Sequence, residues 1–173
     1  MIATLTLTSM LLNRAQDPMM PPVPKSELET VSFLKGRFSG KGQGVDMQGK
    51  TIKITSTSLG NLEMGRWMNI TYTYDLGSMG KMEGRLIFTY NATKKMYEGT
   101  WYDSMSESPM AFTGYTEGKY FVANSPHVMM GEMAMDMKIV YAKESANHYK
   151  LSVKSRPEGG DWMTAMDMDY MRR

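Results

Sequence analysis

The regular alternation of apolar or aromatic residues with polar ones is the feature that most constrains the fold of this chain. Phe88 and Tyr90 alternate with polar neighbours before a polar turn, and Tyr97 and Trp101 do so after it. Successive side chains of a β-strand point to opposite faces, so this period of two predicts two paired strands packed on one side. Residues 91–95, with the sequence NATKK, supply the turn chemistry between them.

The same period recurs along most of the chain after residue 37, in about ten runs separated by turn signals, and no further helical period of useful length interrupts it. The residues that share a face within these runs are Ile52, Ile54, Leu62, Met64, Met68, Ile70, Tyr72, Tyr74, Met82, Gly84, Leu86, Met110, Phe112, Tyr120, Val122, Met133, Met135, Met137, Ile139, Tyr141, Tyr149, Leu151, Val153, Met166, Met168 and Tyr170. Runs spaced this closely predict an all-β barrel or sandwich. Short connections favour antiparallel neighbours, and closure removes exposed strand edges. We therefore predict an up-and-down antiparallel β-barrel of about ten strands.

Three glycines, at positions 40, 42 and 44, fall on one face of the first predicted strand together with Phe38. Without side chains, such positions permit tight coiling of the strand or the close approach of another backbone. We expect this strand to lie at a tightly curved part of the barrel.

A short amphipathic helix is predicted before the first strand. The sequence SELE at residues 26–29 fits a capping box, in which the hydroxyl of the first residue accepts from the N–H of the fourth. Leu28, Val31 and Leu34 then fall on one helical face, and Gly36 ends the segment.

The first 25 residues have a different composition from the rest. Residues 1–12 are apolar and rich in threonine, but they are too few to span a membrane, and they lack the basic start of a secretory signal. We interpret residues 1–25 as a signal-like remnant followed by a Pro-rich linker at 17–25, both outside the fold. A simple disordered tail is the alternative. Residues 26–173 are then one domain, and an extracytoplasmic location (periplasmic or secreted) is expected, with a cytoplasmic one otherwise.

Four short motifs resemble those of a bacterial family of lipocalin-like proteins known as a domain of unknown function. Residues 90–91 (YN) followed by 101–104 (WYDS) are similar to its YD…W.DS signature. Residues 34–38 (LKGRF), 58–62 (SLGNL) and 168–173 (MDYMRR) are similar to its opening, its glycine turn and its C-terminal YxR ending. The resemblance runs from residue 26 to the C-terminus.

The chain departs from that family's pattern at Phe38, Asn61 and Asn91, where the family usually has Trp, Gly and Asp. The resemblance implies a lipocalin-like, calycin-type barrel with a short helix closing one end. It implies no particular reaction.

Composition excludes several classes of site. The chain has no cysteine, which rules out disulfides, zinc–thiolate sites and thiol nucleophiles. The net charge of +2 comes without a lysine or arginine run, so we expect no nucleic-acid partner, and the sequence does not predict an oligomeric state. Methionine is unusually frequent, with 21 residues, and this flexible, polarisable side chain suits irregular apolar cavities and adaptable binding surfaces.

The inward face of the barrel is the first candidate site. Barrels of this size hold either side chains alone or one small ligand, so a packed core and an apolar cavity both remain open. A cavity would hold a small hydrophobic molecule, with tyrosine hydroxyls as its polar groups. The candidate ligand-binding residues are Met68, Tyr72, Phe88, Tyr90, Phe112, Met135, Met137, Met166 and Met168, with Met64 and Met110 beside them.

A second candidate is a copper site in the Met-rich segment after residue 126. Soft thioethers with an imidazole suit Cu(I), and His127, Met129, Met130 and Met133 lie close together in sequence. A hydrophobic strand with its loop explains the same residues. No cofactor is expected, although haem ligation by His127 or His148, as in some ten-stranded barrels, stays open.

Catalytic motifs are absent from the sequence: it contains no G-x-S-x-G, no phosphate-binding loop and no H-E-x-x-H, and no catalytic residue is predicted. We therefore expect a non-enzymatic binder of a small hydrophobic molecule. The alternatives are copper binding, a purely structural or interaction barrel with a packed core, and an enzyme that would need His127 or Asp103 to face a cavity.

Overall fold

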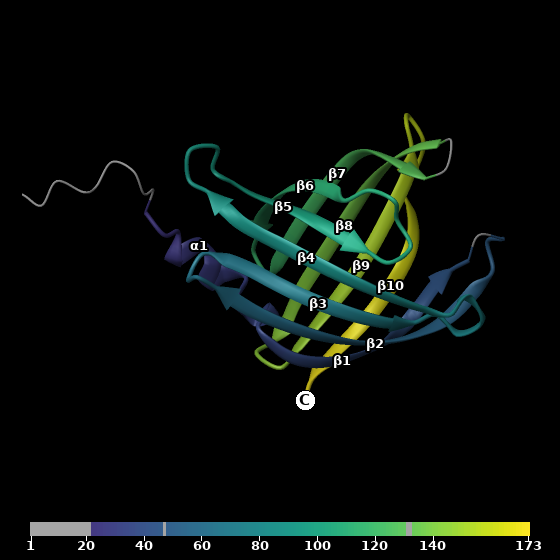
Figure 1. Ribbon diagram of the computed structural model, residues 1–173, viewed down its shortest axis with the longest axis horizontal. Helices are drawn as coiled ribbons and strands as arrows, with labels where there is room; N and C mark the ends of the chain where they lie inside the picture. Colours follow the sequence, from purple (N-terminus) through teal and green to yellow (C-terminus); the bar gives the residue numbers. More distant parts are fainter. Residues whose placement is uncertain (1–21, 47, 131–132) are drawn as a thin grey trace, which may run out of the picture.

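Ten antiparallel strands follow one another around a closed barrel, in which the first strand pairs with the last (Figure 1). The computed structural model describes residues 22–46, 48–130 and 133–173. The elements are α1 (Lys25–Thr30), the 3-10 helix η1 (Ser32–Leu34), β1 (Gly36–Val45), β2 (Thr51–Glu63), β3 (Trp67–Asp75), the 3-10 helix η2 (Gly77–Met79), β4 (Lys81–Asn91), β5 (Met96–Asp103), β6 (Met110–Glu117), β7 (Tyr120–Met130), β8 (Met133–Ser145), β9 (His148–Pro157) and β10 (Met163–Arg172). Every strand pairs with its sequence neighbours, which confirms the predicted up-and-down barrel with a short N-terminal helix.

Side-chain burial follows the predicted period of two. In β2, Ile54, Ser56 and Ser58 are buried, whereas the threonines at 55 and 57 are exposed. The pattern arises because one face of each strand points into the barrel and the other into solvent.

The glycines of β1 allow the close approach that the sequence predicted. A methyl group added at Gly40 would lie 2.6 Å from the ring of Tyr170, and one at Gly42 would lie 1.9 Å from the carbonyl oxygen of Asp167. Both contacts involve β10, with which β1 closes the barrel. Larger residues at these positions would therefore push apart the two strands that close it.

Aromatic rings form the centre of the barrel. Phe88 stacks on Phe121 with 4.9 Å between ring centroids, and Tyr149 stacks on Tyr170 with 4.7 Å. Such pairs contribute about 0.5–1.5 kcal/mol each beyond the burial of their surface. The interior is thus packed with rings at its centre.

The predicted capping box is wrong, although the helix forms. Pro24 is the N-cap residue and α1 begins at Lys25, one residue before Ser26. The Ser26 hydroxyl donates to the Glu27 carboxylate over 2.7 Å, and Glu29 accepts from the hydroxyl of Ser32. A helix that starts directly after proline places Ser26 inside its first turn, where its hydroxyl cannot cap the end.

Two predicted face assignments are also wrong. Met64 does not share the inner face with Met68: it lies in the turn between β2 and β3, with positive φ and 91% of its surface exposed. In β7 the residues that face the interior are Phe121 and Ala123 rather than Tyr120 and its second neighbour. The turn residues after β2 carry no strand period, and the pairing of Phe121 with Tyr141 sets the orientation of β7.

The predicted signal-like stretch at residues 1–16 lies outside the described part of the chain, and so do residues 17–21 of the predicted linker. Residues 22–24 lead directly into α1, which begins at Lys25. Within residues 22–173, apart from 47 and 131–132, no helix combines the length and the hydropathy needed to span a bilayer.

Candidate functional site

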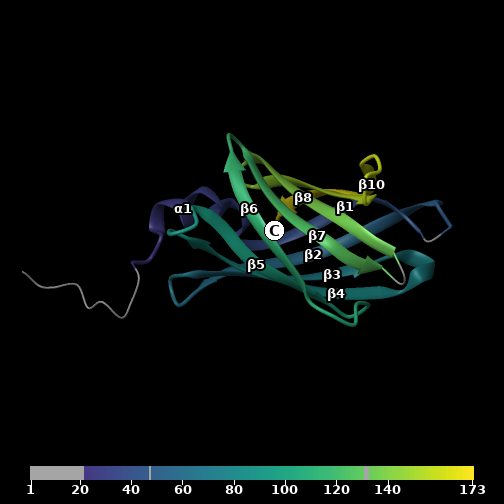
Figure 2. The same cartoon turned by 90° about the horizontal axis from the view of Figure 1, so that it is seen from above.

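One end of the barrel is covered by α1 and η1, which lie beside the ends of β3 and β4 (Figures 1 and 2). The Tyr97 hydroxyl donates to the carbonyl oxygen of Glu27 over 2.6 Å and is 2.8 Å from the Thr30 hydroxyl. A methyl group at Gly60 would lie 2.1 Å from the carbonyl oxygen of Leu34, which shows how closely β2 approaches η1. The helical segment therefore packs tightly on this end and closes it.

The opposite end carries the β3–β4 connection, in which Leu76 beside η2 is buried, and further apolar side chains remain partly exposed around it. We call these side chains the mouth: Ile52, Met82, Trp101, Met110, Met137, Val153 and Met166. They come from β2, β4, β5, β6, β8, β9 and β10, near the strand ends farthest from α1. A ring of flexible thioethers around an aromatic interior is the arrangement expected of an adaptable apolar site.

Trp101 is held in place at this mouth. A methyl group at Gly84 would lie 2.3 Å from the indole, so this glycine makes room for the ring. The indole N–H donates to Asp103 Oδ2 over 2.6 Å, and Asp103 Oδ1 accepts from the backbone N–H groups of Met105 and Ser106. One carboxylate thus anchors both the tryptophan and the start of the β5–β6 loop.

A group of buried hydroxyls lies below the mouth. We call it the hydroxyl cluster: Ser56, Ser58, Tyr72, Tyr74, Tyr141, Tyr149 and Tyr170. Tyr72 donates to the Tyr141 hydroxyl over 3.3 Å, and the hydroxyl of Tyr170 donates to Ser56 over 2.9 Å. The hydroxyls of Ser58 and Tyr149 lie 3.0 Å apart, and the ring of Tyr74 stacks on that of Tyr72. These bonds satisfy hydroxyls that would otherwise be costly to bury.

Burial raises the pKa of all five tyrosines in the cluster. The loss of hydration of the phenolate is the main cause, and neighbouring tyrosines contribute. The pKa of Tyr170 rises to about 12, and the pKa values of Tyr72 and Tyr74 rise well above the usual value. The cluster is therefore neutral at physiological pH, and each hydroxyl keeps a proton to donate.

The nine predicted ligand-binding residues fall into four places. Met68, Phe88, Phe112 and Met168 are buried in the aromatic core, and Met135 is buried on the inner face of β8, two residues closer to the β7–β8 hairpin than Met137. Tyr72 belongs to the hydroxyl cluster, and Met137 and Met166 lie at the mouth. Tyr90 lies toward the closed end, where its ring packs against Tyr97 at 5.1 Å.

The sequence-based site missed most of the hydroxyl cluster. Only Tyr72 was among the predicted site residues, although Tyr74, Tyr141, Tyr149 and Tyr170 have the same period-two signal. The recurrence of tyrosine, instead of phenylalanine, on the inner faces was the signal that could have identified them.

The predicted copper-binding residues lie on the β7–β8 hairpin. His127 is exposed at a bulge with positive φ, and Met129 and Met133 are each 63% exposed. Met129 is directly opposite Ala134, so the adjacent Met133 points to the other face of the hairpin. Met130 pairs with Met133 across the strands. Copper binding stays a prediction that this placement does not favour, and the described residues contain no group of three or more His, Asp or Glu side chains arranged for a metal.

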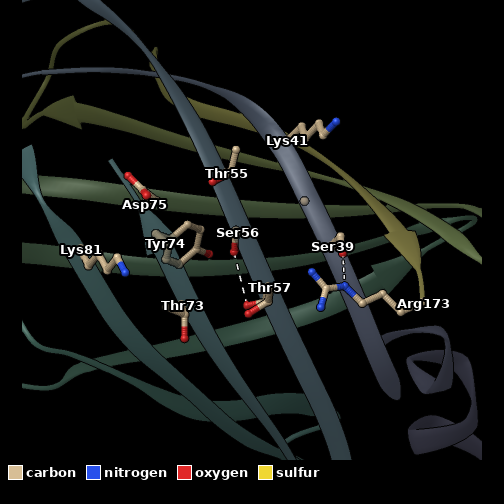
Figure 3. Close-up of a pocket in the computed structure, with 11 residues that line it drawn as sticks. Ser39, Lys41, Thr55, Ser56, Thr57, Thr73, Tyr74, Asp75, Lys81 and Arg173 are labelled. Carbon is tan, nitrogen blue, oxygen red and sulfur yellow. Dashed lines mark hydrogen bonds between the residues drawn. The ribbon is translucent and has the colours of Figure 1, made fainter. Parts of the chain in front are cut away.

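A shallow hollow of about 360 Å³ lies on the outside of the barrel, over β1, β2 and β3 (Figure 3). Its exposed lining is mostly hydroxyls and cations, among them Thr57, Thr73, Lys41 and Arg173. A second hollow of about 200 Å³ adjoins it and shares Thr57, Thr73 and Arg173. Both are surface depressions on a polar sheet face, separate from the mouth.

A closed up-and-down antiparallel barrel with a helix across one end is the architecture of lipocalin-like barrels. The chain belongs to the family described as Protein of unknown function (DUF1579), which matches residues 46–172. This agrees with the resemblance to a family of unknown function, although the match begins after the LKGRF motif at 34–38.

Two solved structures share the fold at low sequence identity. Rv2717c from M. tuberculosis is 12% identical, with a TM-score of 0.59 over 85% of this chain and 97% of that one. The S-type phycobiliprotein lyase CPES from Guillardia theta is 10% identical, with a TM-score of 0.55 over 88% and 98% of the two chains. No curated protein matches the sequence. These similarities establish the fold alone.

Proposed function

We propose that the protein binds a small, mainly apolar molecule that enters the barrel through the mouth. The observation that carries this proposal is the ring of seven partly exposed apolar side chains at the end opposite α1, four of which are Met82, Met110, Met137 and Met166. Apolar surface left in water is unfavourable by about 25 cal/mol per Å², so a ligand that covers this ring gains that free energy.

The mouth suits a ligand better than the closed end does. At the closed end, α1 and η1 already cover the core, and Leu34 and Phe38 are almost completely buried. At the mouth, methionine side chains with three rotatable bonds can move aside and repack around a guest. Binding here needs no catalytic group, in line with a carrier or sensor rather than an enzyme.

The ligand-contacting residues in this proposal are the side chains of the mouth, with Met135 beside Met137 on the inner face of β8. Met68, Phe88 and Phe112 form the packed core beneath it and limit how deep a ligand can go. The site is therefore shallower than a cavity that runs the length of the barrel.

A titration with the neutral dye Nile red tests the proposal. We expect saturable binding with one dye per chain and an increase in dye fluorescence. Met166→Gln, which places a polar amide at the mouth, weakens binding about three- to tenfold, because about 1 kcal/mol of apolar contact is lost. Native mass spectrometry of the purified protein, compared with a denatured sample, shows whether a ligand co-purifies.

Met171→Gln is the matched control, because it makes the same change on the outer face of the same strand, where Met171 is exposed. It leaves dye affinity unchanged. The proposal is wrong if the dye does not bind saturably, or if the two substitutions weaken binding equally.

A further inference from the structure

Buried hydroxyl groups, such as those of the hydroxyl cluster, are unusual at the centre of an otherwise apolar barrel. The ring of a phenylalanine packs as well as that of a tyrosine, and phenylalanine has no hydroxyl that needs a hydrogen-bond partner. Burying an unpaired hydroxyl costs about 1–3 kcal/mol. Five tyrosines and two serines nevertheless come together here from β2, β3, β8, β9 and β10. Ring packing alone does not require these hydroxyls.

Asp103 is a polar group at the mouth itself, and the cluster is the polar group that a ligand would meet farther in. Tyr74 is directly opposite Met82 on the neighbouring strand. The ring of Tyr72 stacks on that of Tyr74 at 5.6 Å and lies 5.7 Å from Trp101. An apolar molecule seated among the mouth residues would thus have its inner end beside these two tyrosines.

We infer that the hydroxyl cluster binds an uncharged carbonyl oxygen at the inner end of the ligand, so that the ligand class is apolar molecules with a ketone, quinone, ester or amide group. This inference rests on the proposed function, since it concerns the same mouth and the same ligand. It adds the chemistry by which the ligand is oriented.

The hydrogen-bonding capacity of the cluster supports a group that only accepts. The hydrogen bonds of the cluster run mainly from hydroxyl to hydroxyl, as from Tyr72 to Tyr141 and from Tyr170 to Ser56. Hydroxyl protons rotate freely about the C–O bond, so a donor that now points to another hydroxyl can turn to a carbonyl oxygen. The hydroxyl left without its donor still accepts or donates within the cluster, so no group becomes unpaired.

The electrostatics of the interior argue against a carboxylate. The buried polar side chains of the described residues are Ser56, Ser58, Asn69 and Ser125, and none of them is charged. An anion buried without a cation is strongly disfavoured. The raised pKa values of Tyr72 and Tyr74 report the same effect, because their own negative form is disfavoured there.

Three ligands with one ring system test the inference: naphthalene, acetylnaphthalene and naphthoate, titrated into the full chain at neutral pH by isothermal calorimetry. We expect acetylnaphthalene to bind about tenfold more tightly than either of the others, because it alone adds neutral acceptor bonds. Tyr72→Phe and Tyr74→Phe each lower its affinity about three- to tenfold and leave that of naphthalene unchanged. Tyr115→Phe, which removes an exposed hydroxyl from the outer face of β6, changes none of the three affinities.

The outcomes separate this inference from the proposed function. Equal affinities for all three compounds, unaffected by the Tyr→Phe changes, overturn the carbonyl assignment and leave apolar binding intact. Tightest binding of naphthoate also overturns it. If neither the three compounds nor Nile red bind, the proposed function itself is overturned. If Nile red binds and none of the three compounds does, only the inference is overturned. Circular dichroism and thermal unfolding of the Tyr72→Phe and Tyr74→Phe proteins show whether each is folded, and either variant alone suffices for the test.

Discussion

The two ends of the barrel are built from the same alternating strands but end in opposite ways. At the closed end, Phe38 has no exposed surface, and its ring packs on Tyr149 at 4.9 Å, with the Arg172 guanidinium 4.6 Å from it on the other side. At the mouth, Met82 and Met166 occupy equivalent inward positions and stay partly exposed. Rigid rings and a helix seal one end, and flexible thioethers surround the other. The difference indicates that stability is concentrated at the closed end, and that the mouth is free to adapt.

Truncation of one core residue at each end tests this difference most strongly. Phe38→Ala is expected to lower the free energy of unfolding by about 3–5 kcal/mol, because it leaves a cavity among fixed rings. Met82→Ala is expected to cost less than about 2 kcal/mol, since its side chain is only partly buried. Urea denaturation measures both. Equal losses would show that the mouth is packed as tightly as the closed end.

Alkaline titration tests the hydroxyl cluster between the two ends. Folding raises the pKa of Tyr170 from 10.0 to about 12, so the unfolded chain releases this proton first. Such a tyrosine makes its full contribution to the free energy of unfolding below about pH 10. As the pH rises toward 12 this contribution is lost, by up to about 1.4 kcal/mol per pH unit for each tyrosine. Phenolate absorbance should show the cluster ionising together with the loss of tertiary structure. Its ionisation in a protein that stays folded would contradict the burial described here.

Two glycine substitutions distinguish a backbone contact from a side-chain contact. Gly60→Ala drives a methyl group against the Leu34 carbonyl at the closed end, and we expect a loss of about 1–3 kcal/mol because neither backbone can move easily. Gly84→Ala meets only the Trp101 ring, which is partly exposed and is anchored by a single hydrogen bond to Asp103. We therefore expect a smaller loss with a change in Trp101 emission, read in a Trp67→Phe, Trp162→Phe background. A larger loss from Gly84→Ala would mean that Trp101 is fixed.

The smallest effect concerns Asp103 at the mouth. Asp103→Asn leaves one oxygen to accept hydrogen bonds, so either the indole or the loop N–H groups lose their acceptor. We expect a loss of about 1 kcal/mol in urea denaturation, with a shift in Trp101 emission. The control is Asp75→Asn, the same substitution at an exposed position. We expect it to change the free energy of unfolding by less than about 0.5 kcal/mol and to leave the tryptophan emission unchanged. Unchanged emission in Asp103→Asn would show that other contacts position the indole.

The sequence was sufficient for the strands and for most of the inner face. Alternation alone placed Met68, Tyr72 and Phe88 in the interior, because the side-chain period of a strand is independent of what lies across from it. It failed at Met64, where the strand period stops at a turn, and at the start of β7, where pairing with β8 decides the face.

The hydroxyl cluster was beyond the reach of such patterns. Tyr72 and Tyr141 are in contact across the interior, yet they lie on strands that are not neighbours in the sheet. Their approach depends on how the closed barrel is tilted and staggered, which no local spacing encodes. Which end stays open likewise depends on where α1 docks, and the sequence showed only that such a helix exists.

The pairing of β1 with β10 also sets the order in which the molecule can form. Strands that are neighbours in sequence can pair locally as hairpins. By contrast, β1 can pair with β10 only after the eight strands between them are in place. Such a distant pairing has a large loop-closure entropy and slows folding. Until β10 leaves the ribosome, β1 presents an unpaired edge to other chains. Barrel closure is therefore a late, all-or-none step, and loss of β10 should produce aggregation in place of a smaller domain.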